Sequence, residues 1–177
     1  GVPGAMASAE SAMIGRDIAL ALDTGARVLF QHVSSAQSVA LIRAGKAMGA
    51  KIYAEVTPHH LSLTEDDVPA HGTYARMNPP LRKEADRQAL IAALADGTID
   101  IVATDHAPHT AEEKAREFAK APSGITGLET AFSVCNTYLV QTGKLTPMQL
   151  VDRMSKAPAE IYGLTDRAVQ QGNFARL

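Results

Sequence analysis

The sequence has little of what marks a secreted, membrane-spanning or nucleic-acid-binding protein. It contains one cysteine, Cys135, so no disulfide can form within the chain, and this usage suits the reducing cytoplasm. Its 17 Lys and Arg residues against 19 Asp and Glu give a net charge of −2, which offers no basic face to nucleic acid or an anionic membrane. No apolar stretch approaches the ~20 residues that cross a bilayer, and the N-terminus lacks a signal-peptide pattern. We therefore expect a cytoplasmic protein.

The length and composition indicate one globular domain. With 177 residues, of which 46% are apolar, the chain is long enough to bury a core of its own. Cys135 lies among apolar residues at helical spacing, so we interpret it as an inert core residue rather than a nucleophile.

Apolar periodicity predicts an α/β protein in which helices and strands alternate. Segments with helical spacing lie at 8–24, 36–48, 84–95, 111–120, 127–141 and 147–154. Ser34-Ser35 and Thr146 are expected to cap the starts of two of them, and Gly25 and Gly97 to end two others. Short β-branched runs lie at 27–33, 51–56 and 99–103. Because helix-length segments separate the strands, we expect parallel pairing with right-handed connections.

These segments also predict what is buried and what is not. The helix at 127–141 is apolar on most sides and should be well buried, whereas 111–120, which includes Lys114, is polar and should be a surface helix. The stretch 69–80 is predicted as a long irregular loop, and 165–177 has too little periodicity for an assignment. On the first helix the expected buried face consists of Met13, Ile14, Ile18, Ala21 and Leu22.

The most informative stretch is ATDHAPH at 103–109, directly after the third predicted strand. Asp105, His106 and His109 arrive within five residues, and Pro108 keeps the segment out of a helix. Polar, metal-competent side chains at the carboxyl end of a buried parallel strand are where α/β enzymes place their chemistry. The alternative is a loop whose aspartate only caps the following turn.

Histidine or aspartate lies at or just after the end of each of the three predicted strands. In a parallel sheet these ends lie side by side, so His32 and Asp105 can converge although they are far apart in the sequence. Imidazole and carboxylate are preferred zinc ligands, and a carboxylate there can also move a proton. Two ligands alone hold zinc poorly, because catalytic sites offer three or more. For His59 and His60, after the second strand, a ligand role and a hydrogen-bonded structural role are both open.

The remaining polar residues point less clearly to chemistry. The sequence Asn78-Pro79-Pro80 predicts a rigid loop, in which the amide either recognises a substrate or only caps the turn. His71 stands alone in the long loop and is expected on the surface. Ordinary solvated faces are expected for the charged residues Glu10, Arg16, Asp17, Arg82, Lys83, Glu84, Asp86 and Arg87.

A set of longer motifs resembles the dihydroorotases of the amidohydrolase superfamily, in particular the larger bacterial class I type. The combination of DHAPH with MNPPLR is specific, since related dihydropyrimidinases and allantoinases differ there. The resemblance covers 1–164 as the C-terminal portion of a barrel and leaves 165–177 as an unassigned tail. The motifs are AESAMIGRDIALA (9–21), FQHVSS (30–35), AEVTPHHLSLTE (54–65), RMNPPLRKEADRQAL (76–90), DGTIDIVATDHAPHT (96–110) and GITGLETAF (124–132).

The resemblance implies a fold and a reaction. The fold is a partial TIM-like (β/α)8 barrel of the metal-dependent hydrolase type, in which the three predicted strands correspond to strands six to eight. The reaction is the reversible interconversion of N-carbamoyl-L-aspartate and L-dihydroorotate in pyrimidine biosynthesis. By the same comparison His59 and His60 are structural residues and not ligands.

The resemblance also implies roles for individual residues. His32 and Asp105 correspond to ligands of a binuclear zinc pair, and Asp105 also corresponds to the catalytic acid and base. Asn78 and His109 match positions that bind the substrate. The loop 121–124 matches a backbone contact to the substrate, through Pro122 and Gly124.

Several family features are absent from these 177 residues. The paired histidines of the first barrel strand, the bridging residue of the fourth and the histidine of the fifth have no counterpart, and a whole barrel takes about 250 residues. We therefore expect an upstream half of the barrel, in this or another polypeptide, and little activity without it.

Three hypotheses about activity and partners follow. The first is the C-terminal part of an active dihydroorotase whose N-terminal half lies outside this sequence or comes from another polypeptide, with a homodimer or an association with aspartate transcarbamoylase as candidate assemblies. The second is a non-catalytic, dihydroorotase-like structural partner of that enzyme, against which the retained His32, Asp105, Asn78 and His109 argue. The third is an amidohydrolase that acts on another cyclic amide or ureide.

Overall fold

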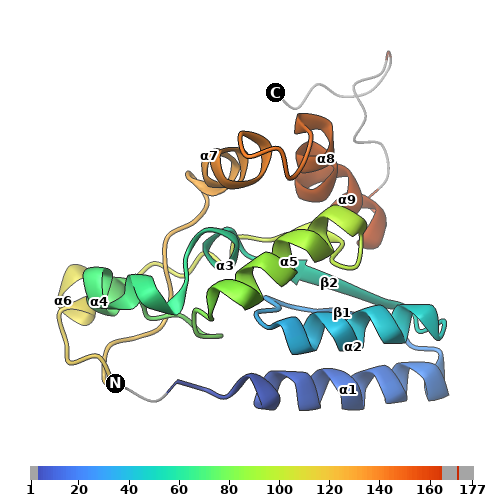
Figure 1. The fold of residues 1–177 in the computed structure, drawn as a ribbon, viewed down its shortest axis with the longest axis horizontal. Helices are drawn as coiled ribbons and strands as arrows, with labels where there is room; N and C mark the ends of the chain where they lie inside the picture. Colours follow the sequence, from blue (N-terminus) through green and yellow to red (C-terminus); the bar gives the residue numbers. More distant parts are fainter. Residues whose placement is uncertain (1–3, 165–170, 172–177) are drawn as a thin grey trace.

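The computed structural model describes residues 4–164 and position 171 (Figure 1). Its centre is a sheet of three parallel strands in the spatial order β1 (Val28–Phe30), β2 (Ile52–Val56) and β3 (Ile101–Val102). Val28 pairs with Ile52 in one ladder, and Glu55 pairs with Ile101 in the other. The predicted parallel pairing is confirmed. Because β2 lies in the middle, its carboxyl end is flanked by the ends of β1 and β3.

Three long helices pack beside one another along this sheet. They are α1 (Ala7–Thr24), α2 (Ala36–Ala47) and α5 (Glu84–Asp96), and Figure 1 shows them one above the other. Gly45 allows a close approach of α2 to its neighbours, because a Cβ there would lie 2.9 Å from the side chains of Ile18 and Ile52. The main core includes Ile14, Ile18, Ala21, Val39, Ile42, Ala54, Val56, Leu90, Ile91 and Leu94.

The ends of these helices follow the predicted capping residues. Gly25 and Gly97 adopt the left-handed conformation, with φ of 71° and 84°, directly after α1 and α5. The side chain of Ser35 accepts a hydrogen bond from the Ser38 amide and begins α2. Thr146 caps the start of α8 (Pro147–Val151) in the same way, through a reciprocal capping box with Gln149.

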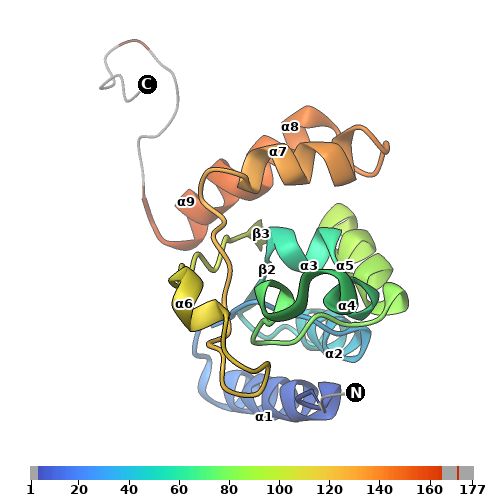
Figure 2. The ribbon, with the colours of Figure 1, turned by 90° about the vertical axis from the view of Figure 1, so that its left-hand side faces the viewer.

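The other helical segments are short. Figure 2 shows α7 and α8 together on the side of the molecule away from α1. The structure assigns α3 (Pro58–Ser62), η1 (Glu65–Asp67), α4 (Val68–His71), η2 (Gly72–Ala75) and α6 (Ala111–Lys114). It continues with α7 (Ala131–Cys135), η3 (Asn136–Val140), α8 (Pro147–Val151), η4 (Asp152–Lys156) and α9 (Ala157–Ile161).

The structure differs from the sequence prediction in the extent of several elements. The first and third strands are shorter than predicted, and the expected loop at 69–80 begins with short helical turns. The predicted helix at 111–120 is a single turn, which begins at a capping box between Thr110 and Glu113 and ends at Lys114. The tail 165–177 lies outside the described residues except at position 171, so the predicted domain boundary at 164 stays a prediction.

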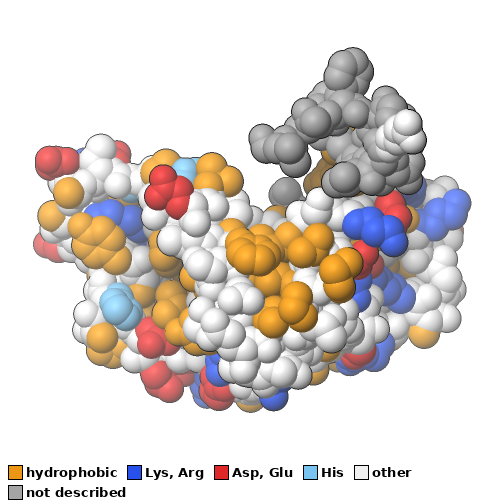
Figure 3. Space-filling model, turned by 90° about the horizontal axis from the view of Figure 1, so that it is seen from above, with side chains coloured by type: hydrophobic (Ala, Val, Ile, Leu, Met, Phe, Trp, Pro, Cys, Tyr) orange, Lys and Arg blue, Asp and Glu red, His pale blue; other side chains and the backbone are white. Residues whose placement is uncertain are grey.

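Some apolar residues predicted to be buried are exposed. Met13 and Leu22 border the buried stripe of α1, and Phe132 and Tyr138 are 56% and 40% exposed on the helical segment 131–140. The prediction that this segment is buried on most sides was therefore wrong. Figure 3 shows hydrophobic side chains gathered in the middle of the face seen from above. Within residues 4–164, no helix has the length and apolar character needed to cross a membrane.

Candidate active site

His32 and Asp105 lie just beyond the carboxyl ends of β1 and β3. Both have left-handed backbone conformations, with φ of 38° and 48°, and they are the two non-glycine residues with positive φ in the described part of the chain. Such conformations are unfavourable for residues with a Cβ and cluster at functional sites. The backbone thus marks the same two residues that the sequence predicts as metal ligands.

Glu55, on the middle strand, is a site residue that the sequence analysis missed. Its side chain is buried, and its Oε1 accepts a hydrogen bond from the His32 amide at 3.3 Å. Its backbone carbonyl accepts from the Val33 amide at 2.9 Å. Burial raises the pKa of the Glu55 carboxyl group. An acidic residue inside the apolar strand 52–56 was the signal for it, because a buried acid needs a partner.

The loop that carries Asn78 is held by His60. Nε2 of His60 lies 3.1 Å from the Pro79 carbonyl and 3.3 Å from that of Pro80, and Nδ1 lies 2.7 Å from the hydroxyl of Thr57. Since carbonyls only accept, Nε2 carries the hydrogen and Nδ1 accepts from Thr57. Both nitrogens are engaged, so His60 has the structural role expected for it.

Burial keeps both adjacent histidines neutral. It lowers the pKa of His59 to about 3 and that of His60 to about 4, and the nearby imidazole of His32 adds to both effects. The rings of His59 and His60 are 4.6 Å apart. Asn78 itself is exposed at the start of the Pro79–Pro80 turn, and the Asn78–Pro79 peptide bond is cis.

Lys114 organises the loop at 121–124. Its ammonium group donates to the carbonyls of Thr73, Pro122 and Gly124 at 3.2, 3.0 and 2.6 Å. The residue is only 4% exposed, so the predicted surface position was wrong. These three carbonyls compensate the buried charge of Lys114. They lie outside 111–120, so the local sequence pattern does not predict the burial of this residue.

His109 contacts the same loop. Its Nε2 lies 3.0 Å from the Ser123 carbonyl, and its Nδ1 lies 3.7 Å from a carboxylate oxygen of Glu113. The ring of His106 is used differently, because its Nδ1 accepts from the amides of Gly127 and Leu128 at 2.9 and 3.3 Å. His106 therefore ties the strand-end loop to the segment before α7.

The predicted site residues form two groups in the structure. His32 and Asn78 share a pocket beside α1, lined also by Glu10, Met13 and Arg82. His109 lies instead with Pro122 and Gly124 in the contacts around Ser123 and Lys114. Asp105 follows β3, which pairs with the carboxyl end of the strand that carries Glu55.

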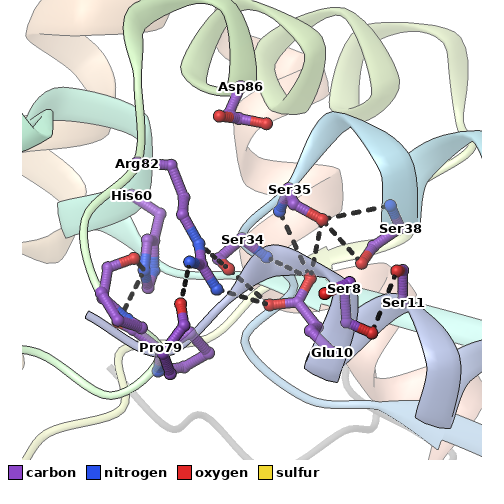
Figure 4. Close-up of polar contacts among 12 residues, drawn as sticks. Ser8, Glu10, Ser11, Ser34, Ser35, Ser38, His60, Pro79, Arg82 and Asp86 are labelled. Atoms are coloured by element: carbon purple, nitrogen blue, oxygen red, sulfur yellow. Dashed lines mark hydrogen bonds and ion pairs between the residues drawn. The ribbon is translucent and has the colours of Figure 1, made fainter. Parts of the chain in front are cut away.

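Glu10 and Arg82 are not solvated, contrary to the sequence prediction. Their side chains are 15% and 12% exposed, and both contact the turn after β1 (Figure 4). Asp86 is also engaged, since its carboxylate accepts from the Ala36 amide at 2.8 Å. Arg87 contacts the Leu61 carbonyl at 3.1 Å. These partners lie far away in the sequence, so the helical pattern around each residue does not show them. His71 is exposed, as predicted.

The donor chemistry fits part of a zinc site. A histidine after β1 and an aspartate after β3 are suitable ligands, and buried Glu55, on the strand between them, accepts a hydrogen bond from the backbone of the histidine. Within the described residues no three His, Cys, Asp or Glu side chains are grouped closely enough to hold a metal ion. A catalytic zinc site built around His32 and Asp105 would therefore need further ligands besides these two.

A parallel β/α sheet with histidine and aspartate at its carboxyl edge defines a class, the metal-dependent hydrolases built on (β/α)8 barrels. Residues 15–168 match the model of the amidohydrolase family, and the chain belongs to this family. The predicted fold class, three parallel strands of such a barrel, is confirmed by solved structures. L-Hydantoinase (dihydropyrimidinase) from Arthrobacter aurescens superposes with a TM-score of 0.88 at 31% identity, over 93% of this chain and 38% of that one. D-Hydantoinase (dihydropyrimidinase) from Thermus sp. superposes with a TM-score of 0.83 at 30% identity, over 93% of this chain and 37% of that one.

Curated proteins similar in sequence to this chain are dihydroorotases. Dihydroorotase from Clostridioides difficile is 52% identical over 99% of this chain and 42% of its own length. Dihydroorotase from Clostridium acetobutylicum is 49% identical over 97% of this chain and 41% of its own length. The chain thus spans about two fifths of the length of these curated relatives, and the resemblance to dihydroorotases is confirmed.

Proposed function

We propose that this chain provides the strand-end residues of a dihydroorotase, a zinc-dependent cyclic amide hydrolase that interconverts N-carbamoyl-L-aspartate and L-dihydroorotate in the cytoplasm. The observation that carries the proposal is the identity of about 50% to dihydroorotases over nearly the whole chain. The left-handed backbone at His32 and Asp105 supports it, because it marks the two residues that would hold metal.

The proposed roles follow from the chemistry of each side chain. His32 and Asp105 would hold zinc, and a bound zinc ion would supply Lewis-acid activation of the ring amide carbonyl and of water. Asp105 accepts the proton of the attacking water and returns it to the ring nitrogen as the amide C–N bond breaks. Asn78 and His109 bind the ring and carboxylate of the substrate, and the backbone at Pro122 and Gly124 completes the contact.

The remaining parts of the site are proposed to come from outside these 177 residues. A binuclear zinc site needs more protein ligands than His32 and Asp105 supply. We propose that further residues of the same barrel, in this or another polypeptide, provide them. The proposal includes a homodimer or a complex with aspartate transcarbamoylase. To test it, the mass of the protein isolated from its source is measured, and any copurifying polypeptide is identified. A longer polypeptide or a copurifying partner supports the proposal, and a single chain of these 177 residues that turns over dihydroorotate contradicts it.

The variant Asp105→Asn tests the acid–base role. It keeps an oxygen ligand but cannot take up a proton, so dihydroorotate turnover should be lost while zinc, measured by elemental analysis, stays bound. Asp66→Asn, an exposed residue with the same change of charge, should leave turnover intact. Unchanged turnover in Asp105→Asn would contradict the role.

A second candidate function rests on the solved structures, which are hydantoinases and dihydropyrimidinases. In this case the site would hydrolyse hydantoin, dihydrouracil or a related ureide. Assays of dihydroorotate, hydantoin, dihydrouracil and allantoin with one preparation separate the candidates. Preference for dihydroorotate supports the first, and preference for any of the others supports the second.

A further inference from the structure

A carboxylate on α1 holds the turn that follows β1. Glu10 Oε1 accepts from the backbone amides of Ser34 and Ser35 at 3.1 and 3.3 Å, and from the Ser35 hydroxyl at 3.4 Å. Glu10 Oε2 accepts from the Ser34 hydroxyl (Figure 4). Both serines are fully buried. The two carboxylate oxygens thus supply the acceptors that this buried turn needs, directly after His32.

Arg82 joins the same turn to the loop that carries Asn78. Its Nε donates to the Ser34 hydroxyl at 3.1 Å, and its Nη2 lies 3.9 Å from Glu10 Oε2. Since Arg82 follows Asn78 by only four residues, its anchoring also restrains the Pro79–Pro80 segment, whose other side is held by His60. Figure 4 shows Arg82 between the His60–Pro79 contact and Glu10.

The hydroxyl group of Ser34 determines which groups donate and which accept in these hydrogen bonds. A guanidinium group only donates, so Ser34 Oγ accepts from Arg82 and donates its own hydrogen to Glu10. A glutamine at position 10 would offer one acceptor oxygen, and its amide would face the donors of the turn or Arg82. The arrangement therefore requires a carboxylate at position 10.

We propose that Glu10 and Arg82 are positioning residues that set the His32 turn and the Asn78 loop in one fixed relation. This rests on the proposed function, in which His32 holds metal and Asn78 binds the substrate. His32 and Asn78 line one pocket, and Glu10 and Arg82 lie in its wall, so a shift of this pair changes the distance between the His32 turn and the Asn78 loop. Small displacements of this kind cost on the order of 100-fold in rate.

The test compares Glu10→Gln with the wild type and with Asp23→Asn, an exposed acid at the other end of the same helix. Two readouts are needed on the protein as isolated. NMR records the ring resonances of His32 and the side-chain amide of Asn78 in the folded protein. Steady-state kinetics with dihydroorotate record kcat and KM separately.

We expect Glu10→Gln to shift both sets of resonances, to raise KM and to lower kcat/KM by roughly 100-fold. Asp23→Asn should match the wild type in all of these. A purely structural role would reduce the fraction of folded protein, and so the apparent kcat, without moving KM or the Asn78 amide. Unshifted resonances in folded Glu10→Gln would overturn the proposal, and so would an unchanged KM.

The variant Arg82→Lys decides the matter if Glu10→Gln does not fold. Lysine keeps the charge but cannot reach Ser34 and Glu10 in the same planar geometry, so the same resonances should shift. Unshifted resonances in this variant overturn the proposal as well. If the wild type does not hydrolyse dihydroorotate, the proposed function fails, and the NMR comparison alone decides whether Glu10 and Arg82 position the two loops.

Discussion

The side chain of Glu55 accepts a hydrogen bond from the backbone amide of His32, 3.3 Å away, across the ladder between β1 and β2. This amide belongs to a residue with a left-handed backbone, and Glu55 is the acceptor that holds it. Glu55→Ala should lower the free energy of unfolding by about 2 kcal/mol, because it leaves the amide without this partner. Glu55→Gln keeps an acceptor and removes the cost of burying a charge, so it should be at least as stable as the wild type at pH 7. Urea unfolding measures both, and equal losses in the two variants would contradict this role.

Lys114 should contribute strongly to stability although it is a lysine. Lys114→Met removes the donor shared by the carbonyls of Thr73, Pro122 and Gly124, and we expect a loss of about 3 kcal/mol. Lys120→Met, at a side chain that is 72% exposed, should change stability by less than about 0.5 kcal/mol. Denaturant midpoints of the two variants give the comparison. A small effect at Lys114 would mean that the carbonyls find other donors.

Gly124 should not tolerate a side chain. Its φ is 136°, and a Cβ would lie 2.7 Å from Ala107 and 3.2 Å from His109 Nε2. Gly124→Ala should therefore destabilise the protein by about 3 kcal/mol and displace His109. Gly143→Ala is the matched control, since φ is 72° there but no atom lies within 4 Å, and it should cost only about 1 kcal/mol. Thermal unfolding of both variants separates the steric effect from backbone strain, and similar losses would exclude a clash at Gly124.

Acidification should destabilise the protein through His60 and His59. The pKa of His60 is lowered to about 4 by burial, so below about pH 6.5 the unfolded chain takes up a proton that the folded protein does not. Stability should fall as the pH decreases from 6.5 to about 4, by roughly 3 kcal/mol from His60 alone. Urea unfolding at several pH values measures this slope, and NMR should show both rings unprotonated at pH 5. A ring that titrates near pH 6 would contradict the burial argument.

Local sequence patterns were sufficient for much of the framework. Glycines 25 and 97 and the caps at Ser35 and Thr146 act at the helix ends where they were predicted, because capping involves residues only a few positions apart. Helix-length spacing between strands likewise predicted the parallel sheet. Strand lengths were less predictable, since a strand ends where its neighbour stops pairing.

Charged residues were the main source of error. Glu10, Arg82 and Lys114 have patterns typical of a surface helix, yet each is buried against partners 24, 48 and 41 positions away. Glu55 was overlooked for the same reason, since its partner His32 lies beyond the end of another strand, 23 positions away. Periodicity describes only the residues of one element, and burial of a charge depends on which other element supplies the compensating hydrogen bonds.

The sequence by itself determined the class of this protein, since its motifs place it with amidohydrolases and put His32 and Asp105 at the ends of parallel strands. Those inferences hold because the motifs and the alternation of helices and strands are patterns of the local sequence. Only the tertiary structure decided which side chains hold the turns and loops around these residues in place. Glu10, Glu55 and Lys114 do so through hydrogen bonds to backbone groups that the fold brings to them, and no spacing within one element specifies such contacts.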